Sequence, residues 1–592
     1  MNIVNNIIIK RSMEELKHIL NEVNQDNLMN TIQWMVDNVP YRLAGSEDEK
    51  RAAEYVTMRM KEYGLDVVNE EFFAYNSNPI YSKVEIISPI AKEIESLPCA
   101  HIKGTKPEGE EFDIVYVGDG SYDSYTNINA KGKVVLVEVS YAPPVPEKAR
   151  IAYEKGASGI MCMNWGNDEE VICHRGLKAV WGNPTEETMC NIPDILGVGI
   201  TRNAGLKLKE LCSAEENVKV RITASATREW SKVHQPKGII YGSGKHDQFL
   251  LVSSHLDAWK PGVTCNATGN ATALELCRIL SKYRHELNRD IYFVFWNGHE
   301  IAEAAGSTWF VDNYWDLINK KCAGYINIDS TGVCNTKIFE IKASDELLRF
   351  SINNFNELVK DIDIRAMSLK KIGDQSFMGI GVPAITQRMS FTQEDMDKAH
   401  GATLGWWNHT KEDSIDKCDT NILYIDTKVT LSLIYKLATT DILPYEFKDK
   451  FDSIINRISS IDEKYGEHLN LAELRKELME TGDKIAGIQK NRTLITPEDV
   501  EMYNKFVIVT SRLLTNVFQT YSDKFQQDSY GYTKLASKIP LFADLERIEK
   551  LDTNSIEYGM VHTQLIKNRN RISDSLKILN DFADLYLKIF KL

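Results

Sequence analysis

Apolar runs and helix-period segments alternate between residues 236 and 440. Residues 249–252 and 291–296 are almost wholly apolar, as strands covered on both faces are. Between them, residues 271–283 carry apolar positions at helical spacing. This alternation predicts an α/β fold, in which a mixed, largely parallel sheet is sandwiched by helices.

The hydrophobic patterns before residue 236 and after residue 440 differ from this alternation. Helix-period positions occupy residues 13–36 and 45–63, and short strand-like runs at 114–117, 134–139 and 159–163 follow. Long helical stretches at 445–465, 469–490, 497–525 and 556–590 end the sequence. We therefore expect four regions: 1–75, the start of the α/β domain; 76–235, a β-rich insertion; 236–440, the main α/β domain; and 441–592, a helical domain.

The last helical stretch has a broad apolar stripe. Its members are Leu565, Ile572, Leu576, Leu579 and Phe582. Such a stripe fits either packing within the chain or a dimer interface. The sequence does not separate these two interpretations.

Composition narrows the class of protein. The chain has 592 residues, 43% hydrophobic and 26% charged, with a formal net charge of -14. A nucleic-acid-binding protein normally displays a basic face, and the sequence has no basic block. We therefore predict no nucleic-acid partner.

The N-terminal segment and the cysteines indicate the compartment. The first residues contain only three consecutive isoleucines, and no run of about 18 apolar residues occurs anywhere, so we predict neither a signal peptide nor a membrane span. The ten cysteines form no CxxC pair. This usage is typical of reduced thiols, and we expect a cytoplasmic protein.

Five short segments at predicted strand ends carry candidate chemistry. They are His255-Leu256-Asp257, the glycine-bracketed loop 261–269 that contains Cys265, Gly298-His299-Glu300, Asp329, and His409-Thr410-Lys411-Glu412-Asp413. Histidines and carboxylates at the carboxyl edge of a parallel sheet are typical of a metal site. Each segment alone is a weak signal, but five in this order are specific.

This ordered set resembles the family of co-catalytic zinc aminopeptidases and glutamate carboxypeptidases, which also includes the transferrin receptor. The resemblance covers nearly the whole chain. Residues 132–137, 147–150 and 156–160 resemble the protease-associated domain inserted in larger members, and the helical tail resembles their dimerisation domain. It implies a homodimer and a zinc-dependent enzyme with one or two Zn²⁺ ions per chain.

The resemblance also implies a set of metal ligands. His255 and Asp329 would hold one metal ion, and Glu300 and His409 the other. Asp257 would orient the His255 ring. Histidine and carboxylate ligands suit Zn²⁺.

The sequence departs from the family pattern at two positions. Cys265 occupies the place of the aspartate that bridges the metals, and it is either a thiolate ligand that favours softer metals or a small buried residue. His299 occupies the place of the general base. At the start of a helix it would be neutral and able to act as base or acid, although a ligand or an inert role stays open.

A rival motif overlaps this site. Residues 299–303 read His-Glu-Ile-Ala-Glu, close to the HExxH of single-zinc proteases, in which His299 and Glu303 would share a helix face as ligands. That interpretation leaves His255, Asp329 and His409 without a role. We therefore favour the two-metal arrangement.

These observations predict a metal-dependent hydrolase of amide bonds in small peptides or N-acyl and amino-acid conjugates, with His299 moving the proton. The alternatives are a non-hydrolytic binding or scaffolding protein and a lyase that uses the altered site. No substrate-binding residue is assigned. Trp259, Trp406 and Trp407 are candidates for the pocket, and ordinary packing explains each of them at least as well. Arg388 could meet a substrate carboxylate, although a surface salt bridge is the more common role of an arginine.

Overall fold

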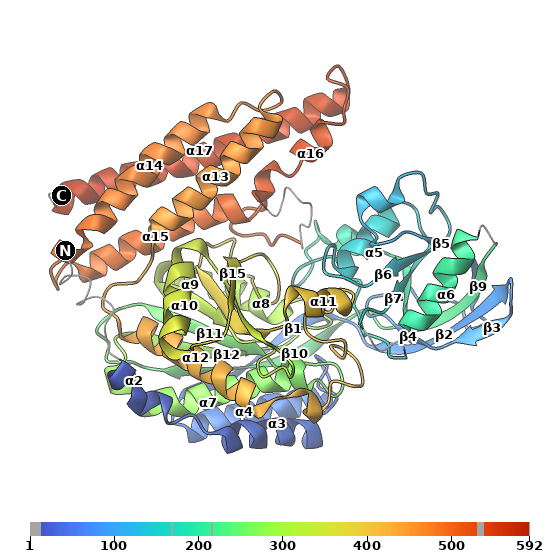
Figure 1. Cartoon of the computed structure of the whole chain (residues 1–592), viewed down its shortest axis with the longest axis horizontal. Coiled ribbons are helices and arrows are strands. Elements are labelled where there is room, and N and C mark those ends of the chain that lie inside the picture. Colours follow the sequence, from blue (N-terminus) through green and yellow to red (C-terminus); the bar gives the residue numbers. More distant parts are fainter. Residues whose placement is uncertain (1–12, 167–169, 215–216, 530–537, 591–592) are drawn as a thin grey trace.

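A computed structural model describes residues 13–166, 170–214, 217–529 and 538–590 (Figure 1). Two eight-stranded sheets and a C-terminal group of long helices make up the molecule. In Figure 1 the helical group lies above the first sheet and the second sheet lies beside it.

Three helices open the described chain: α2 (Met13–Leu20), α3 (Gln25–Asn38) and α4 (Glu47–Glu62). The helix predicted over 13–36 is interrupted at residues 21–24, because the side chain of Asn24 caps a new helix by accepting from the N–H of Asn27. The prediction over 45–63 is confirmed. Ser46 caps α4 through the N–H of Glu49.

The first sheet has the strand order β1-β10-β12-β11-β13-β16-β14-β15. The bounds are Asp66–Asn76 (β1), Glu229–Ile240 (β10), Asp290–Trp296 (β12), Phe249–His255 (β11), Cys322–Asn327 (β13), Ala384–Ser390 (β16), Ile338–Ala343 (β14) and Ile364–Ser368 (β15). Strands β12, β11, β13 and β16 are parallel, and antiparallel pairs flank them. The predicted strands at 249–252 and 291–296 are confirmed.

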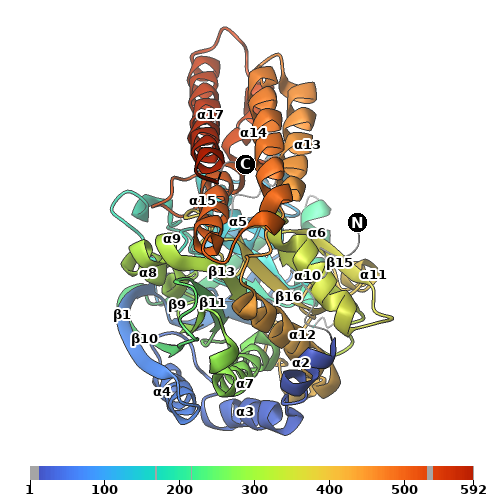
Figure 2. The same cartoon turned by 90° about the vertical axis from the view of Figure 1, so that its left-hand side faces the viewer.

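Helices cover both faces of this sheet. The remaining helices of this part are α7 (Thr268–Lys282), α8 (Ala305–Asn313), α9 (Trp315–Lys321), α10 (Asp345–Leu358), α11 (Gln393–Lys398) and α12 (Thr420–Thr439). On β11, Leu250 and Val252 join the core with α3, α4, α7 and α12, whereas Phe249 and Leu251 join the core with α8 and α9. Figure 2 shows α3, α4 and α7 together below the sheet. The predicted α/β fold class is confirmed.

The second sheet has the order β3-β2-β9-β5-β6-β7-β8-β4. The bounds are Lys92–Ile94 (β3), Pro79–Ser88 (β2), Lys219–Ala226 (β9), Glu110–Tyr116 (β5), Val134–Glu138 (β6), Gly159–Met163 (β7), Leu196–Ile200 (β8) and Ser96–Pro98 (β4), with helices α5 (Val145–Glu154) and α6 (Arg202–Ser213). All of these strands fall within the region expected to be β-rich. Residues 229–235, expected in the insertion, belong instead to β10 of the first sheet.

The C-terminal helices are α13 (Phe447–Tyr465), α14 (Ala472–Lys490), α15 (Val500–Gln519), α16 (Leu545–Ile548) and α17 (Ile556–Phe590). Helix α17 packs on α14 and α15. Leu565, Ile572, Leu576 and Leu579 of its apolar stripe are fully buried there. The stripe therefore serves packing within the chain, and the dimer-interface interpretation of these four residues is wrong. No described helix is long and apolar enough to cross a membrane.

Candidate metal centre

Three neighbouring parallel strands bring the predicted ligands together. His255 is the last residue of β11, Asp329 follows β13, and Glu300 lies four residues after β12. Carboxyl ends of parallel strands meet at one edge of a sheet, where α/β proteins place their ligand sites. His409 reaches the same edge from the loop that precedes α12.

Cys265 lies among the other candidate ligands. Its Sγ atom is 3.7 Å from Nε2 of His255, 3.5 Å from Oε1 of Glu300 and 3.5 Å from Nε2 of His409. Nε2 of His255 lies 3.6 Å from Oδ1 of Asp329, and Nε2 of His409 lies 3.1 Å from Oε2 of Glu300. All five predicted ligands therefore converge.

The donor set fits zinc. Zn–N distances of about 2.0 Å and Zn–S distances of about 2.3 Å place tetrahedral ligands roughly 3.3–3.8 Å apart. The five separations measured here span 3.1–3.7 Å. Among the described residues, His255, Cys265 and Glu300 also form a compact group with all ligand atoms within 4.8 Å of one another.

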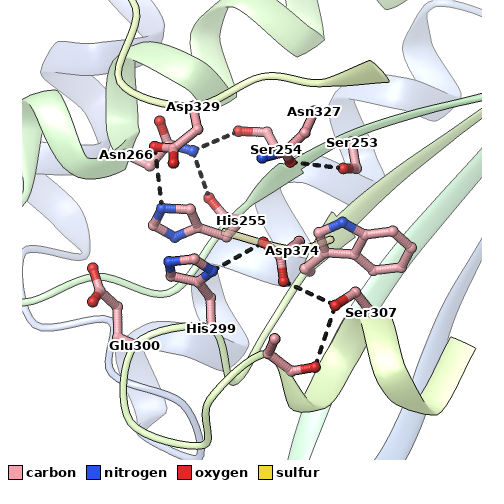
Figure 3. A network of polar contacts seen from close by, with 12 residues as sticks. Ser253, Ser254, His255, Asn266, His299, Glu300, Ser307, Asn327, Asp329 and Asp374 are labelled. Carbon is pink, nitrogen blue, oxygen red and sulfur yellow. Dashed lines mark hydrogen bonds and ion pairs between the residues drawn. The ribbon is translucent and has the colours of Figure 1, made fainter. Parts of the chain in front are cut away.

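The loop before α7 positions Cys265. Residues Val263–Ala267 form a single wide helical turn in which Cys265 itself has non-helical backbone angles. The carboxylate of Asp413 accepts the N–H of Cys265 and both the N–H and the hydroxyl of Thr264. The side chain of Asn266 donates to Oγ of Ser254 and to the carbonyl of His255, which joins the loop to β11 (Figure 3).

Burial and neighbouring charges shift the pKa values of the ligands. Burial raises the pKa of Cys265 well above its ordinary value, so the thiol is protonated in the metal-free protein. Burial alone would raise the pKa of Glu300 too, but the adjacent His409 lowers it to about 2. A metal ion reverses the preference of the thiol, because a coordinated thiol is deprotonated.

Asp257 differs from its expected role. Nδ1 of His255 lies 2.9 Å from the backbone carbonyl of Asp257, so the carbonyl and not the carboxylate orients the ring. The carboxylate instead accepts hydrogen bonds from the backbone N–H groups of His299 and Glu300, and both donor–acceptor distances are 3.0 Å. Asp257 thus fixes the loop that follows β12, which is where Glu300 is held.

His299 does not begin a helix, contrary to the prediction. Residues 299–304 form turns, and α8 starts only at Ala305. The argument that a helix dipole keeps the imidazole neutral is therefore wrong. Burial alone would lower the pKa of His299, but the carboxylate of Asp374, 2.9 Å from its Nδ1 atom, raises it well above its ordinary value. The ring stacks on His255 with centroids 3.9 Å apart (Figure 3).

The rival HExxE interpretation fails for the same reason. His299 and Glu303 cannot share a helix face, because the segment is not helical and Glu303 has a φ of 49°. Glu300 of the same segment lies among the candidate ligands of the two-metal arrangement.

A cavity of about 300 Å³ adjoins the donor set. Cys265, His299, Glu300, Asp329 and His409 all line it, as do Trp259 and Arg388 from the candidate pocket residues. Trp407 is buried and donates from Nε1 to the hydroxyl of Thr264.

The segment after β7 supplies cavity residues that sequence reasoning missed. His174 and Arg175 line the cavity, and the N–H of His174 donates to the carbonyl of His409 over 2.8 Å. The His174 ring stacks on Trp259 with centroids 4.7 Å apart. No periodicity or motif marks these two residues, because they lie in an irregular loop of the second sheet and reach the site only through the tertiary fold.

The donor set is of the kind that binds zinc, and it lies at the sheet edge where α/β proteins place their ligand sites. In the comparisons with known proteins, residues 238–433 match the family model of Peptidase family M28.

Individual relatives support the same assignment. Aminopeptidase YwaD of Bacillus subtilis is 22% identical over 426 residues, which cover 71% of this chain and 86% of that enzyme. Human transferrin receptor protein 2 is 21% identical over 283 residues, 42% of this chain and 34% of the receptor, so the match spans about a third of that receptor. The structure of BSAP, a zinc aminopeptidase from Bacillus subtilis, superposes with a TM-score of 0.54 at 20% identity, covering 70% of this chain and 95% of BSAP.

Proposed function

We propose that this protein is a zinc-dependent hydrolase of amide bonds in small peptides or N-acyl and amino-acid conjugates. The observation that carries the proposal is the convergence of five ligand-type side chains from five separate segments. Four of these side chains, those of Cys265, Glu300, Asp329 and His409, line one cavity. Side chains of this kind do not gather in a buried site for packing alone, because their desolvation is costly without a partner.

Two pairs of residues would hold the metal. His255 and Asp329 form one pair and Glu300 and His409 the other, with Cys265 within reach of both histidines. When bound, zinc supplies a Lewis acid that polarises a carbonyl group and lowers the pKa of a water molecule. The protein supplies the fixed geometry, the anionic charge of its ligands and a small cavity.

His299 is the residue that we assign to proton transfer. Because its Nδ1 atom is engaged by Asp374, Nε2 is the atom left to accept or deliver a proton. Stacking on His255 and the hydrogen bond to Asp374 hold the ring next to the ligands (Figure 3). In the Ser-His-Asp triad a histidine oriented by a carboxylate moves the proton in the same way.

The size of the cavity supports small substrates. Its lining comes from the first sheet and from the second-sheet segment that contains Tyr141 and Arg175. About 300 Å³ holds a dipeptide-sized ligand and not a folded protein. We therefore propose that residues 76–235, as a protease-associated-like insertion, limit access to the site. The homodimer and the cytoplasmic location stay predictions.

Metal content and turnover test the proposal. Protein purified under reducing conditions without chelator should contain one or two zinc ions per chain by elemental mass spectrometry. It should hydrolyse aminoacyl or N-acyl amide substrates, and chelation should abolish turnover. Protein that binds no zinc even after zinc is added back would refute the hydrolase and leave a binding protein on a peptidase fold.

Point variants test the residue roles. His299→Ala should lose about 10²–10⁴-fold in kcat, the usual contribution of general acid–base catalysis, while zinc content stays unchanged. Glu300→Ala should lose both zinc and activity. His285→Ala, which removes an exposed histidine, is the matched control. Full activity in both His299→Ala and Glu300→Ala would contradict the assignment.

A further inference from the structure

We propose that Trp181 is a positioning residue for His299 and acts through a chain of hydrogen bonds that ends on Asp374. Trp181 belongs to the segment between β7 and β8 of the second sheet, whereas His299 follows β12 of the first. The inference rests on the proposed hydrolase and deepens it, because the contact between the two sheets becomes a condition for proton transfer and does more than limit access.

The segment between β7 and β8 contacts the turns at residues 299–304. The N–H of Gly182 donates to the carbonyl of Glu303 over 2.6 Å. Gly182 has a φ of 72°, and a Cβ atom there would lie 2.5 Å from the side chain of Thr308, so the position requires glycine. This close approach brings the neighbouring Trp181 within reach of the site.

A chain of hydrogen bonds links Trp181 to His299. Nε1 of Trp181 donates to the hydroxyl of Ser376 over 2.8 Å, and this hydroxyl lies 2.8 Å from that of Ser307. Ser307 donates to Oδ1 of Asp374 over 3.0 Å, and Oδ2 of Asp374 lies 2.9 Å from Nδ1 of His299 (Figure 3). The side chains of Asp374, Ser307 and Ser376 are completely buried, so bulk water does not compete for these contacts.

The two ends of the chain fix the direction of its bonds, because an indole N–H can only donate and a carboxylate can only accept. The proton of Ser307 points to Asp374, whose Oδ1 atom has no other donor in the described part of the chain. The competing carbonyl of Ala304, 3.2 Å from the Ser307 hydroxyl, already accepts the N–H of Thr308. Ser376 therefore donates to Ser307, and it accepts from the indole and from the hydroxyl of Thr308.

A chain with one direction transmits the effect of the indole to the carboxylate. Successive hydrogen bonds in a buried site polarise and strengthen one another. With the indole N–H in place, the Ser376 hydroxyl is held with its proton on Ser307, and Ser307 holds the Asp374 carboxylate in the orientation that faces His299. Without the indole N–H, the Ser376 hydroxyl is free to turn and this support weakens.

The C-terminal region holds Ser376 from another side. Nε2 of Gln527, in the loop after α15, donates to the carbonyl of Ser376 over 3.0 Å, and Oε1 of Gln527 accepts from Nζ of Lys371 over 2.6 Å. Nζ of Lys371 also lies 4.6 Å from the centroid of the Trp181 ring. Segments from both sheets and from the helical region therefore meet at Ser376, which fixes the geometry of the chain of hydrogen bonds.

Kinetics of single variants test this assignment. Trp181→Phe keeps an aromatic ring but removes the donor, and it should lower kcat about 3- to 10-fold, the contribution of one hydrogen bond, with KM and zinc content unchanged. Ser376→Ala breaks the chain without altering the tryptophan and should lower kcat to a similar extent. The matched control is Trp315→Phe, which should keep the wild-type kcat, because Nε1 of Trp315 is buried without an acceptor among the described residues.

A double-variant cycle separates positioning from general packing. In an Asp374→Asn background the chain no longer ends on a carboxylate, so adding Trp181→Phe should change kcat by less than about 2-fold. The full loss on adding Trp181→Phe in both backgrounds would overturn the inference. Wild-type kcat in both Trp181→Phe and Ser376→Ala would also overturn it.

Nuclear magnetic resonance separates this inference from the proposed function, because it requires no turnover. In the full chain with isotope-labelled tryptophan, at a fixed zinc content, the indole resonance that is lost in Trp181→Phe identifies Trp181. Its proton resonance should move upfield in Asp374→Asn and in Ser307→Ala, because the indole hydrogen bond weakens when the chain loses its charged end, whereas that of Trp315 should stay. This result supports the inference even if hydrolysis is never seen. A Trp181 resonance that stays in place in both variants would overturn it while leaving the hydrolase intact.

Discussion

Nδ1 of His299 lies 2.9 Å from Oδ2 of Asp374, whose carboxylate is completely buried. The hydroxyl of Ser307 donates to the other oxygen of Asp374 over 3.0 Å, so both oxygens are engaged (Figure 3). The pair fixes the ring at the donor set and makes Asp374 a positioning residue for the proposed proton transfer.

Replacing Asp374 with asparagine should therefore reduce activity without removing metal. Asparagine keeps the size of the side chain but loses the charge that stabilises a protonated His299. We expect kcat to fall by about 10-fold or more, up to the 10²–10⁴-fold that general acid–base catalysis contributes. Steady-state kinetics with zinc analysis would measure this, and Asp397→Asn on the surface is the control. Unchanged kcat with full zinc would exclude a role for the pair.

Cys265 should determine metal stoichiometry and preference. Because its Sγ atom lies within 3.7 Å of both His255 and His409, Cys265→Ala should lower the zinc content. Cys265→Asp should keep metal but shift the preference from Zn²⁺ and Cd²⁺ toward harder ions such as Mn²⁺. Thiolate-to-cadmium absorption in the ultraviolet should appear on titration of the wild type and be absent from both variants. If Cys265→Ala bound cadmium with the same spectrum and stoichiometry, the thiol would not be a ligand.

The strands and ligand positions were predictable because they depend on short-range patterns. Strands β11 and β12 are buried on both faces, so their sequences are continuous apolar runs. His255 is the last residue of β11 and Glu300 lies four residues after β12, and parallel strands place such ends together. The convergence of His255, Glu300 and Asp329 follows from this regularity, whereas Cys265 and His409 join them from loops.

The rest depends on contacts between distant segments. Asp374 and Arg175 lie in irregular loops, and each meets a histidine of the site only through the tertiary fold. The helix-dipole argument for His299 was wrong because the turns at 299–304 delay α8 to Ala305. Asp257 does orient the His255 ring, but through its backbone carbonyl and not through its carboxylate. The direction of the backbone decides which of the two groups faces His255, and residue type alone does not reveal it.

A buried ion pair should dominate the attachment of the C-terminal helices. Lys450 of α13 contacts Glu346 of α10 over 2.9 Å, and the two side chains are 1% and 0% exposed. Lys450→Met leaves the buried carboxylate of Glu346 without its cationic partner, with only the Ser511 hydroxyl still donating to it, and should cost about 3–5 kcal/mol in the free energy of unfolding. The double variant Lys450→Met/Glu346→Leu should recover most of this loss. Urea denaturation of the wild type, Lys450→Met, Glu346→Leu and the double variant gives the coupling energy, and additive effects of the two substitutions would contradict it.

Lys178 should make stability depend on pH above neutrality. It is fully buried, donating from Nζ to the carbonyls of Gly182 and Ala302, and burial lowers its pKa to about 7 despite the opposing charge of Glu303. An unfolded lysine has a pKa of about 10.4. Between pH 7 and 10 the unfolded state therefore binds more protons, so the free energy of unfolding contributed by Lys178 rises with pH, by at most about 1.4 kcal/mol per pH unit.

Lys178→Met removes this contribution. The free energy of unfolding of the wild type minus that of the variant should therefore increase from pH 7.5 to 9.5. Urea denaturation at several pH values measures it, and groups common to both proteins cancel in the difference. Lys320→Met, which alters an exposed lysine, should give a difference that does not vary with pH. A wild-type-minus-Lys178→Met difference that stays constant, or shrinks as the pH rises, would mean that Lys178 keeps its proton in the folded protein and that the polar groups around it outweigh its burial.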